Sequence, residues 1–342
     1  MAVKLTEKEN FMKCINGETP DWVPRYYMGV DPYSTVGPQC MSVMSSFNGP
    51  PRRTENGFFD MWGVEYVATA ETGWQSLPKP NDFILDDIRN WRDVIKVPDI
   101  SEIDWDLVAK RDEESRTFNP ADVATMGGGG GGFFMNLMNF MGFTNGLIAM
   151  FEEPDEVHAM FDYMCTYFEE VVSKVLPRYP IDIFTVGDDT ATATNPFISP
   201  LMYRELVKPY TARVAKLANE KNMPVMMHDC GRCEDSIEDW RDFGVNSWNP
   251  AQIVNDLKGI KEKYGNELVL IGCWDSQGPA GWDTCTEELM RSEVRKTIDA
   301  YAANGGFMFW GSTYGPADDQ GLINRRQWMT SEYEAYREVP YK

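Results

Sequence analysis

The sequence predicts an α/β protein built as a (β/α)8 barrel of the TIM type, with an irregular N-terminal extension. Three observations support this fold class. Short apolar segments of strand type alternate with amphipathic helical segments from about residue 100 onwards. The turns between them are short, and no repeat or long linker interrupts the alternation. Because alternating strands and helices require parallel pairing, this many units favour a closed barrel over an open sheet.

The predicted organisation is a single domain that covers residues 1–342. Residues 1–100, approximately, form the extension, with a helix at 7–15, a first strand at 21–30 and a hairpin segment at 58–70. Thr6 and Glu9 can form a capping box at the start of that helix. Residues 100–342, approximately, supply the regular β/α units.

The regular part is read from its hydrophobic periodicity. Helices are expected where apolar residues recur every three or four positions, with Pro154 and Ser199-Pro200 as start signals, at 153–176, 201–221, 234–244, 254–265 and 287–305. Strands are expected in the short apolar runs between them, at 182–189, 223–230, 245–250, 268–275 and 306–315.

Composition limits the class of partner. The chain carries 53 acidic and 32 basic residues, a formal net charge of −21, which argues against nucleic acid and anionic membranes as partners. The segment MAVKLTEKENF lacks the apolar h-region of a secretory signal, and no apolar run is long enough to span a bilayer. The 7 cysteines are an odd number scattered along a large chain, as expected for reduced thiols. We therefore expect a cytoplasmic protein.

Polar residues follow the predicted strands at the barrel end where this fold places its active sites. His228 and Cys230 are separated by one residue, so their side chains point to the same side of a strand. Zinc binds both ligand types, and a catalytic zinc needs three protein ligands. We expect Cys273 as the third, with Cys233 and Asp189 as alternatives. A redox Cys-x-x-Cys pair and purely structural thiols are the competing interpretations.

Two further groups of residues are candidates for the site. Asp188 and Asp189 end an otherwise apolar strand. They either cap a helix or turn, or they orient the substrate or support the metal site, and we predict a catalytic role. The predicted substrate-binding residues are aromatic, and they are Tyr27, Trp274, Trp310 and Tyr314. The glycine run at 127–132 lacks the Lys-Ser/Thr of a phosphate loop. It is interpreted as a segment whose backbone passes close to a ligand or moves as a lid.

Several segments together resemble the uroporphyrinogen decarboxylase-like superfamily, in particular its corrinoid-dependent methyltransferase branch. They are TEKENFMKCINGETPDWVP, GDDTATATNPFISPLMYRELVKPY, HDCGRCEDSIEDWRDFGVNSWNP and GGFMF. The resemblance implies a (β/α)8 barrel with a funnel-shaped site at its mouth. It also implies zinc bound through His228 and Cys230. The third cysteine that is common in the final strand of that branch is missing from GFMFWGSTYG.

The resemblance implies a function as well. Decarboxylases of this superfamily hold propionates with an arginine-rich N-terminal motif, whereas DWVPRYYMGV contains only Arg25. Neither histidine lies in the Asp-x-His-x-x-Gly context of a corrinoid-carrying domain, so a separate corrinoid protein would carry the cobamide. We expect a zinc-dependent methyltransferase that moves a methyl group between a small donor, with a methoxylated aromatic as the favoured one, and that partner's cobalt. The alternatives are methyl transfer from a methylcorrinoid protein to a thiol acceptor, a metal-free lyase or decarboxylase, and a non-catalytic binder of a corrinoid protein.

Overall fold

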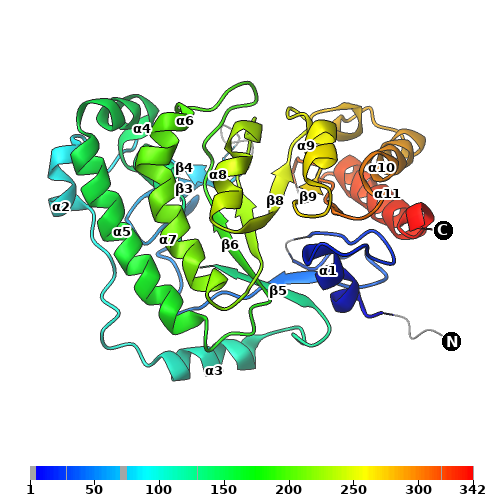
Figure 1. Cartoon of the computed structure of the whole chain (residues 1–342), viewed down its shortest axis with the longest axis horizontal. Helices are drawn as coiled ribbons and strands as arrows, with labels where there is room; N and C mark the ends of the chain where they lie inside the picture. The colour runs from blue at the N-terminus through cyan, green and yellow to red at the C-terminus, as the bar shows by residue number, and fades with distance from the viewer. Residues whose placement is uncertain (1–4, 28, 70–74, 129, 317, 342) are drawn as a thin grey trace.

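A curled parallel sheet forms the centre of the protein (Figure 1). The computed structural model describes residues 5–27, 29–69, 75–128, 130–316 and 318–341. Within these residues the sheet has seven strands, which neighbour one another in chain order: β1 (Cys40–Ser42), β5 (Ala124–Gly128), β6 (Ile183–Gly187), β7 (Val225–His228), β8 (Val245–Ala251), β9 (Val269–Gly272) and β10 (Phe307–Phe309). All their pairings are parallel.

The segment before β1 lies at the place of an eighth strand. Arg25 forms an isolated parallel bridge with Phe309 of β10. On its other side, side chains link it to the β1 region: the Arg25 N–H donates to Gln39 Oε1, and the Tyr27 N–H donates to Cys40 Sγ. The α/β class and the TIM-like arrangement are therefore confirmed, while the ladder of the described residues has seven strands rather than the predicted eight.

Helices follow most strands and cover the outside of the sheet (Figure 1). The helices are α1 (Glu7–Ile15), α2 (Trp91–Val94), α3 (Trp105–Ser115), α4 (Phe133–Glu152), α5 (Pro154–Val175), α6 (Pro200–Met202), α7 (Lys208–Asn219), α8 (Ile237–Asp242), α9 (Leu257–Tyr264), α10 (Glu287–Tyr301) and α11 (Gln320–Tyr336). Local sequence sets their starts. Thr6 and Glu9 make the expected capping box, and the Ser199 hydroxyl accepts the Met202 N–H. No helix of the described residues is long and apolar enough to cross a membrane.

The extension carries a small separate sheet. Its strands β2 (Gly57–Phe59), β3 (Glu65–Val67) and β4 (Leu77–Pro78) are antiparallel, and β2 and β3 form the hairpin expected at 58–70. Trp62, between these two strands, packs edge-on against Phe140 of α4 and Phe168 of α5. The extension is therefore joined to the helical layer by aromatic contacts.

The strands bury both faces, as expected for a parallel sheet. The inner core, on the concave side, contains alternate strand residues such as Met126, Met226 and Met308, and it includes Phe11 and Cys14 of α1. The outer core lies between the sheet and the helices and contains the intervening residues, such as Val225 and Met227. This alternation decides which strand-end side chains point towards the mouth of the sheet.

Candidate functional site

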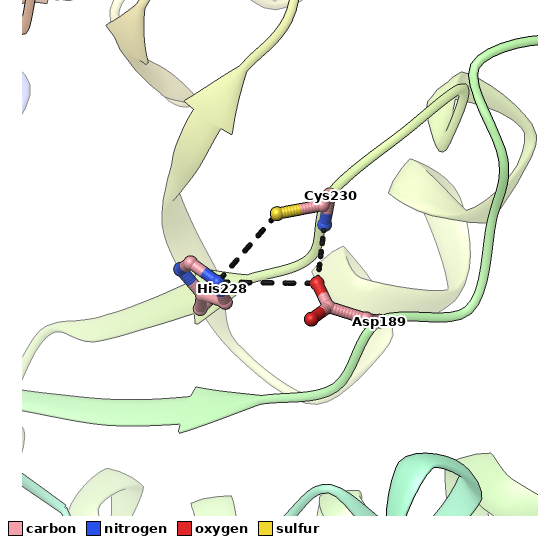
Figure 2. Close-up of side chains that lie close together, drawn as sticks. All are labelled: Asp189, His228 and Cys230. Carbon is pink, nitrogen blue, oxygen red and sulfur yellow. Dashed lines mark hydrogen bonds and ion pairs between the residues drawn. The ribbon is translucent and has the colours of Figure 1, made fainter. Parts of the chain in front are cut away.

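Three side chains with metal-ligating atoms meet at the C-terminal ends of β6 and β7 (Figure 2). Asp189 follows β6, His228 is the last residue of β7, and Cys230 lies two residues further on. One potential ligand atom from each lies within 4.8 Å of the other two. The site is thus at the end of the sheet where the sequence predicts it, and it contains the predicted pair His228 and Cys230.

His228 is oriented by a neighbouring strand. Its Nδ1 lies 2.7 Å from Oδ1 of Asn249, a buried residue of β8. When Nδ1 donates to this amide oxygen, Nε2 is the nitrogen with the free lone pair. Nε2 faces the other two side chains, 3.7 Å from Cys230 Sγ and 3.9 Å from Asp189 Oδ1 (Figure 2). The sequence marks Asn249 as a strand end but does not predict this role.

Cys230 is held beside Asp189 by its own backbone. The Cys230 N–H donates to Asp189 Oδ1 at 3.0 Å, so the loop after β7 is tied to the end of β6. Burial, followed by the charge of Asp189, raises the pKa of the Cys230 thiol. A thiolate beside a carboxylate requires a compensating cation, because buried like charges repel each other.

The donor set fits zinc. Tetrahedral coordination with ordinary Zn–N, Zn–S and Zn–O bonds separates the ligand atoms by about 3.3–3.6 Å. The distances of 3.7 Å and 3.9 Å from His228 Nε2 are therefore within a few tenths of an ångström of that requirement. The hydrogen bond from Asn249 is the outer contact that usually fixes the orientation of a ligating histidine.

The two adjacent aspartates have different environments. Asp188 is buried and turns away from His228 towards the start of α4, where its two oxygens accept the N–H groups of Phe134 and Met135 at 2.9 Å. Burial raises the pKa of Asp188 to about 7, against the opposing effect of these hydrogen bonds. Asp189 is the aspartate at the metal-ligating cluster. The catalytic role expected of Asp188 stays a prediction, and the structure gives it a helix-anchoring role.

Asp188→Asn is expected to change how stability depends on pH. Because burial raises the pKa of Asp188 to about 7, the folded protein keeps a proton between about pH 4 and pH 7 that the unfolded chain has lost, and the free energy of unfolding falls as the pH rises through this range. Asparagine cannot ionise, so the variant should lack this part of the fall and gain stability relative to the native protein between about pH 5 and pH 8. Urea denaturation at the two pH values measures the difference. The control is Asp104→Asn, which changes an exposed cap of α3 and should keep the native pH dependence. Parallel pH profiles for Asp188→Asn and the native protein would contradict this expectation.

The thiols of the two other cysteines considered as ligands do not belong to the cluster. Cys233 is buried, and its thiol lies 3.0 Å from the Cys230 carbonyl oxygen. Cys273 follows β9, borders the same cavity as His228 and belongs to the outer core. Neither thiol is among the ligand atoms that converge within the described part of the chain. The geometry thus brings together the alternative third ligand, Asp189, rather than the favoured Cys273.

A cavity of about 430 Å³ opens beside the cluster and has His228 and Cys230 in its wall. Its volume lies in the range of small-molecule sites, about 300–1,000 Å³. The predicted substrate-binding aromatics all line it, and they are Tyr27, Trp274, Trp310 and Tyr314. The Trp274 indole donates to the carbonyl oxygen of Ser312, which fixes this side chain in the wall.

His228 also borders a second cavity, of about 320 Å³, on the inner side of the sheet. Met126 and Met226 of the inner core line it, together with Gly128 and Gly130. Of the glycine run, Gly127 and Gly128 end β5, and Gly130, Gly131 and Gly132, just before α4, have positive φ angles. A Cβ atom at Gly131 would lie 2.8 Å from the Gly187 carbonyl oxygen. This segment therefore passes close to the backbone of β6, while its expected role beside a ligand or as a lid stays a prediction.

Comparison with known proteins decides the family. The model of the uroporphyrinogen decarboxylase (URO-D) family matches residues 84–310, well over half of the chain. The chain belongs to this family. The uroporphyrinogen decarboxylase family domain thus includes β5 to β10 and every residue of the cluster. The superfamily resemblance found in the sequence is confirmed. No curated protein matches the chain.

Among solved structures, this uroporphyrinogen decarboxylase family member is similar to a methyltransferase from Methanosarcina mazei. The TM-score is 0.61 at 13% identity, over 97% of this chain and 99% of the other. At that identity the likeness shows a shared fold over essentially the full length. An archaeal fructose 1,6-bisphosphate aldolase gives a TM-score of 0.28 at 14% identity, over 51% of this chain and 62% of that one, which is too low to indicate a shared fold.

Proposed function

We propose that this protein is a zinc-dependent methyltransferase that moves a methyl group from a methoxylated aromatic to the cobalt of a separate corrinoid protein. The observation that carries the proposal is the convergence of Asp189, His228 and Cys230, of which His228 and Cys230 line an aromatic cavity. The family and the fold shared with a methyltransferase from Methanosarcina mazei support the reaction class.

The three converging residues would hold the metal. His228 offers Nε2, Cys230 its sulfur and Asp189 a carboxylate oxygen, which leaves one coordination position for the substrate. Zinc in this site would supply Lewis-acid polarisation of the ether oxygen. We place Asp189 before Cys273 as the third ligand because its oxygen already lies 3.9 Å from His228 Nε2.

The remaining residues of the site position the substrate. The aromatic walls formed by Trp310 and Tyr314 would hold a flat ring beside the cluster. The methyl group would then pass to cobalt(I) of the partner's corrinoid, and the phenolate would leave with the electron pair of the C–O bond. Since the sequence has no corrinoid-binding Asp-x-His-x-x-Gly motif, we propose that the corrinoid comes from a partner protein.

The test combines metal analysis with a single-turnover assay. We expect the purified protein to contain about one zinc per chain, as a single three-ligand site predicts. We expect methylcobalt(III) to form when the protein is mixed with a cobalt(I) corrinoid protein and a panel of methoxylated aromatics. The visible absorption of methylcobalt(III) measures its formation. Methyl transfer from methylcobalt(III) to a thiol, without demethylation of any ether, would instead support the thiol-acceptor alternative. A metal-free protein would contradict both methyltransferase versions, the one with an ether donor and the one with a thiol acceptor. It would leave the lyase alternative.

A further inference from the structure

The cavity beside the cluster has two arginines in its wall, and one of them is neutralised. Arg25 Nη1 lies 2.7 Å from Asp31 Oδ2, and both side chains are at least 90% buried. The Thr330 hydroxyl donates to the same carboxylate oxygen and accepts a hydrogen bond from Arg25. This group contributes no net charge to the cavity, although Arg25 is the arginine of the N-terminal motif and its Nε has no hydrogen-bond partner among the described residues.

The second arginine, Arg326 of α11, carries an uncompensated charge. Its guanidinium donates to the carbonyl oxygen of Thr313 at 3.2 Å, and it makes no ion pair within the described ranges of the chain. Its neighbour Arg325, by contrast, pairs with Asp283. In a chain of net charge −21, a half-buried arginine without an acidic partner is unexpected. Arg326 therefore makes the wall of the cavity positive where the protein is otherwise negative.

The hydroxyl group of Thr313 is a second unused donor in the same wall. Thr313 is only 4% exposed, and its Oγ1 has no hydrogen-bond partner among the residues that the structure describes. A buried hydroxyl without a partner costs free energy, so such groups are typically satisfied by a ligand or by water. The hydrogen bond from Arg326 to the Thr313 backbone brings this hydroxyl and the guanidinium into one region of the cavity wall.

We propose that Arg326 and Thr313 bind a carboxylate of the substrate, so that the methyl donor is a methoxylated aromatic acid rather than a neutral ether. A guanidinium is the side chain best matched to a planar carboxylate, and a hydroxyl donor beside it adds a further hydrogen bond. The ring would lie against the aromatic wall that includes Tyr314, which follows Thr313 in the chain. The assignment of a methoxy group to this donor rests on the proposed function. The assignment of a carboxylate subsite rests on the residues of the cavity wall alone.

Binding of a matched pair of probes tests the proposal without catalysis. We expect 4-methoxybenzoate to bind the protein at least about tenfold more tightly than 4-methoxybenzamide, which has the same shape but no charge. Isothermal titration calorimetry measures both affinities. Arg326→Gln should abolish the preference, and Arg326→Lys should retain part of it because the charge remains. Thr313→Val should weaken the benzoate more than the benzamide, because a hydrogen bond to a charged acceptor is the stronger one. Its fold should tolerate the change because the hydroxyl has no partner to lose among the described residues.

The control for general charge effects is Arg111→Gln. Arg111 is exposed on α3, far from α11 in Figure 1, and like Arg326 it makes no ion pair within the described chain. This variant should keep the full preference for benzoate. Equal affinities of the two probes for the native protein, no measurable binding of either, or a preference that survives in Arg326→Gln would each overturn the proposal. A zinc-free protein that still selects benzoate would refute the proposed reaction and leave the carboxylate subsite intact.

Discussion

Cys230→Ser and His228→Ala are each expected to remove zinc from the purified protein and to lower methyl transfer by at least about 100-fold. Loss of an outer-shell contact alone commonly costs about 10- to 100-fold, and these variants lose a ligand itself. Both side chains are partly exposed at the cavity wall, so neither replacement empties the core. Metal analysis by mass spectrometry and the corrinoid methylation assay measure the two effects, with circular dichroism as the check on folding.

The same measurements identify the third ligand. Asp189→Asn should weaken zinc binding by at least about tenfold, because the amide has no charge to offset that of the metal. Cys273→Ala should leave the zinc content unchanged, and Cys233→Ala serves as a matched control for removal of a buried thiol near the cluster. Zinc lost from Cys273→Ala and retained in Asp189→Asn would reverse the assignment and restore the ligand set expected from the sequence.

Regular strand geometry explains why the pair at the centre of the site could be predicted. In β7, Val225 and Met227 face the outer core and Met226 faces the inner core. His228 continues this alternation, so its side chain points into the mouth of the sheet, and Cys230 follows it there. Spacing in the sequence was sufficient because the two faces alternate without interruption along β7. The register shift beside Val225 and Met226 places its extra residue, Asn246, on β8.

Irregular backbone explains what could not be predicted at Cys273. A regular strand would have turned this thiol towards the same mouth, but the residue has a φ of 55°, in the left-handed region. The regular alternation of β9 therefore ends at this residue, and Cys273 joins the outer core. A cysteine in that conformation has no recognisable sequence signal, since glycine and asparagine are the usual residues there.

Two helices that shape the site were also missing from the predicted elements. In the sequence, the residues of α4 form an aromatic and methionine-rich patch, and no helix was predicted there. The hydrogen bonds from the N-terminus of this helix to Asp188 could therefore not be predicted. In α11 the buried positions mix apolar residues with Arg325, Thr330 and Glu332, which hides the apolar stripe that identifies a helix. Arg326, which this helix presents to the cavity, was therefore not part of any predicted helix or strand.

Gly231→Ala is expected to destabilise the protein by about 2–4 kcal/mol and to disrupt the metal-ligating cluster. Gly231 has a φ of 94° and follows Cys230 directly. A Cβ atom at this position would lie 2.5 Å from the Ala191 carbonyl oxygen and 2.6 Å from that of Thr192. Both contacts are with backbone, so the loop after β7 would have to move away from the loop after β6. Cys230 and Asp189 lie on these two loops, and their separation would increase.

Gly63→Ala separates the effect of the clash from the effect of the backbone angle. Gly63 has nearly the same φ, 92°, but a Cβ atom added there would have no described atom within 4 Å. In this control the free energy of unfolding should fall by only about 1 kcal/mol, the conformational cost of alanine at positive φ. The control should also keep its zinc. Urea denaturation and metal analysis of both variants give the comparison. If Gly231→Ala were no less stable than Gly63→Ala and bound zinc equally well, the close approach of the two loops would not be what holds Cys230 beside Asp189.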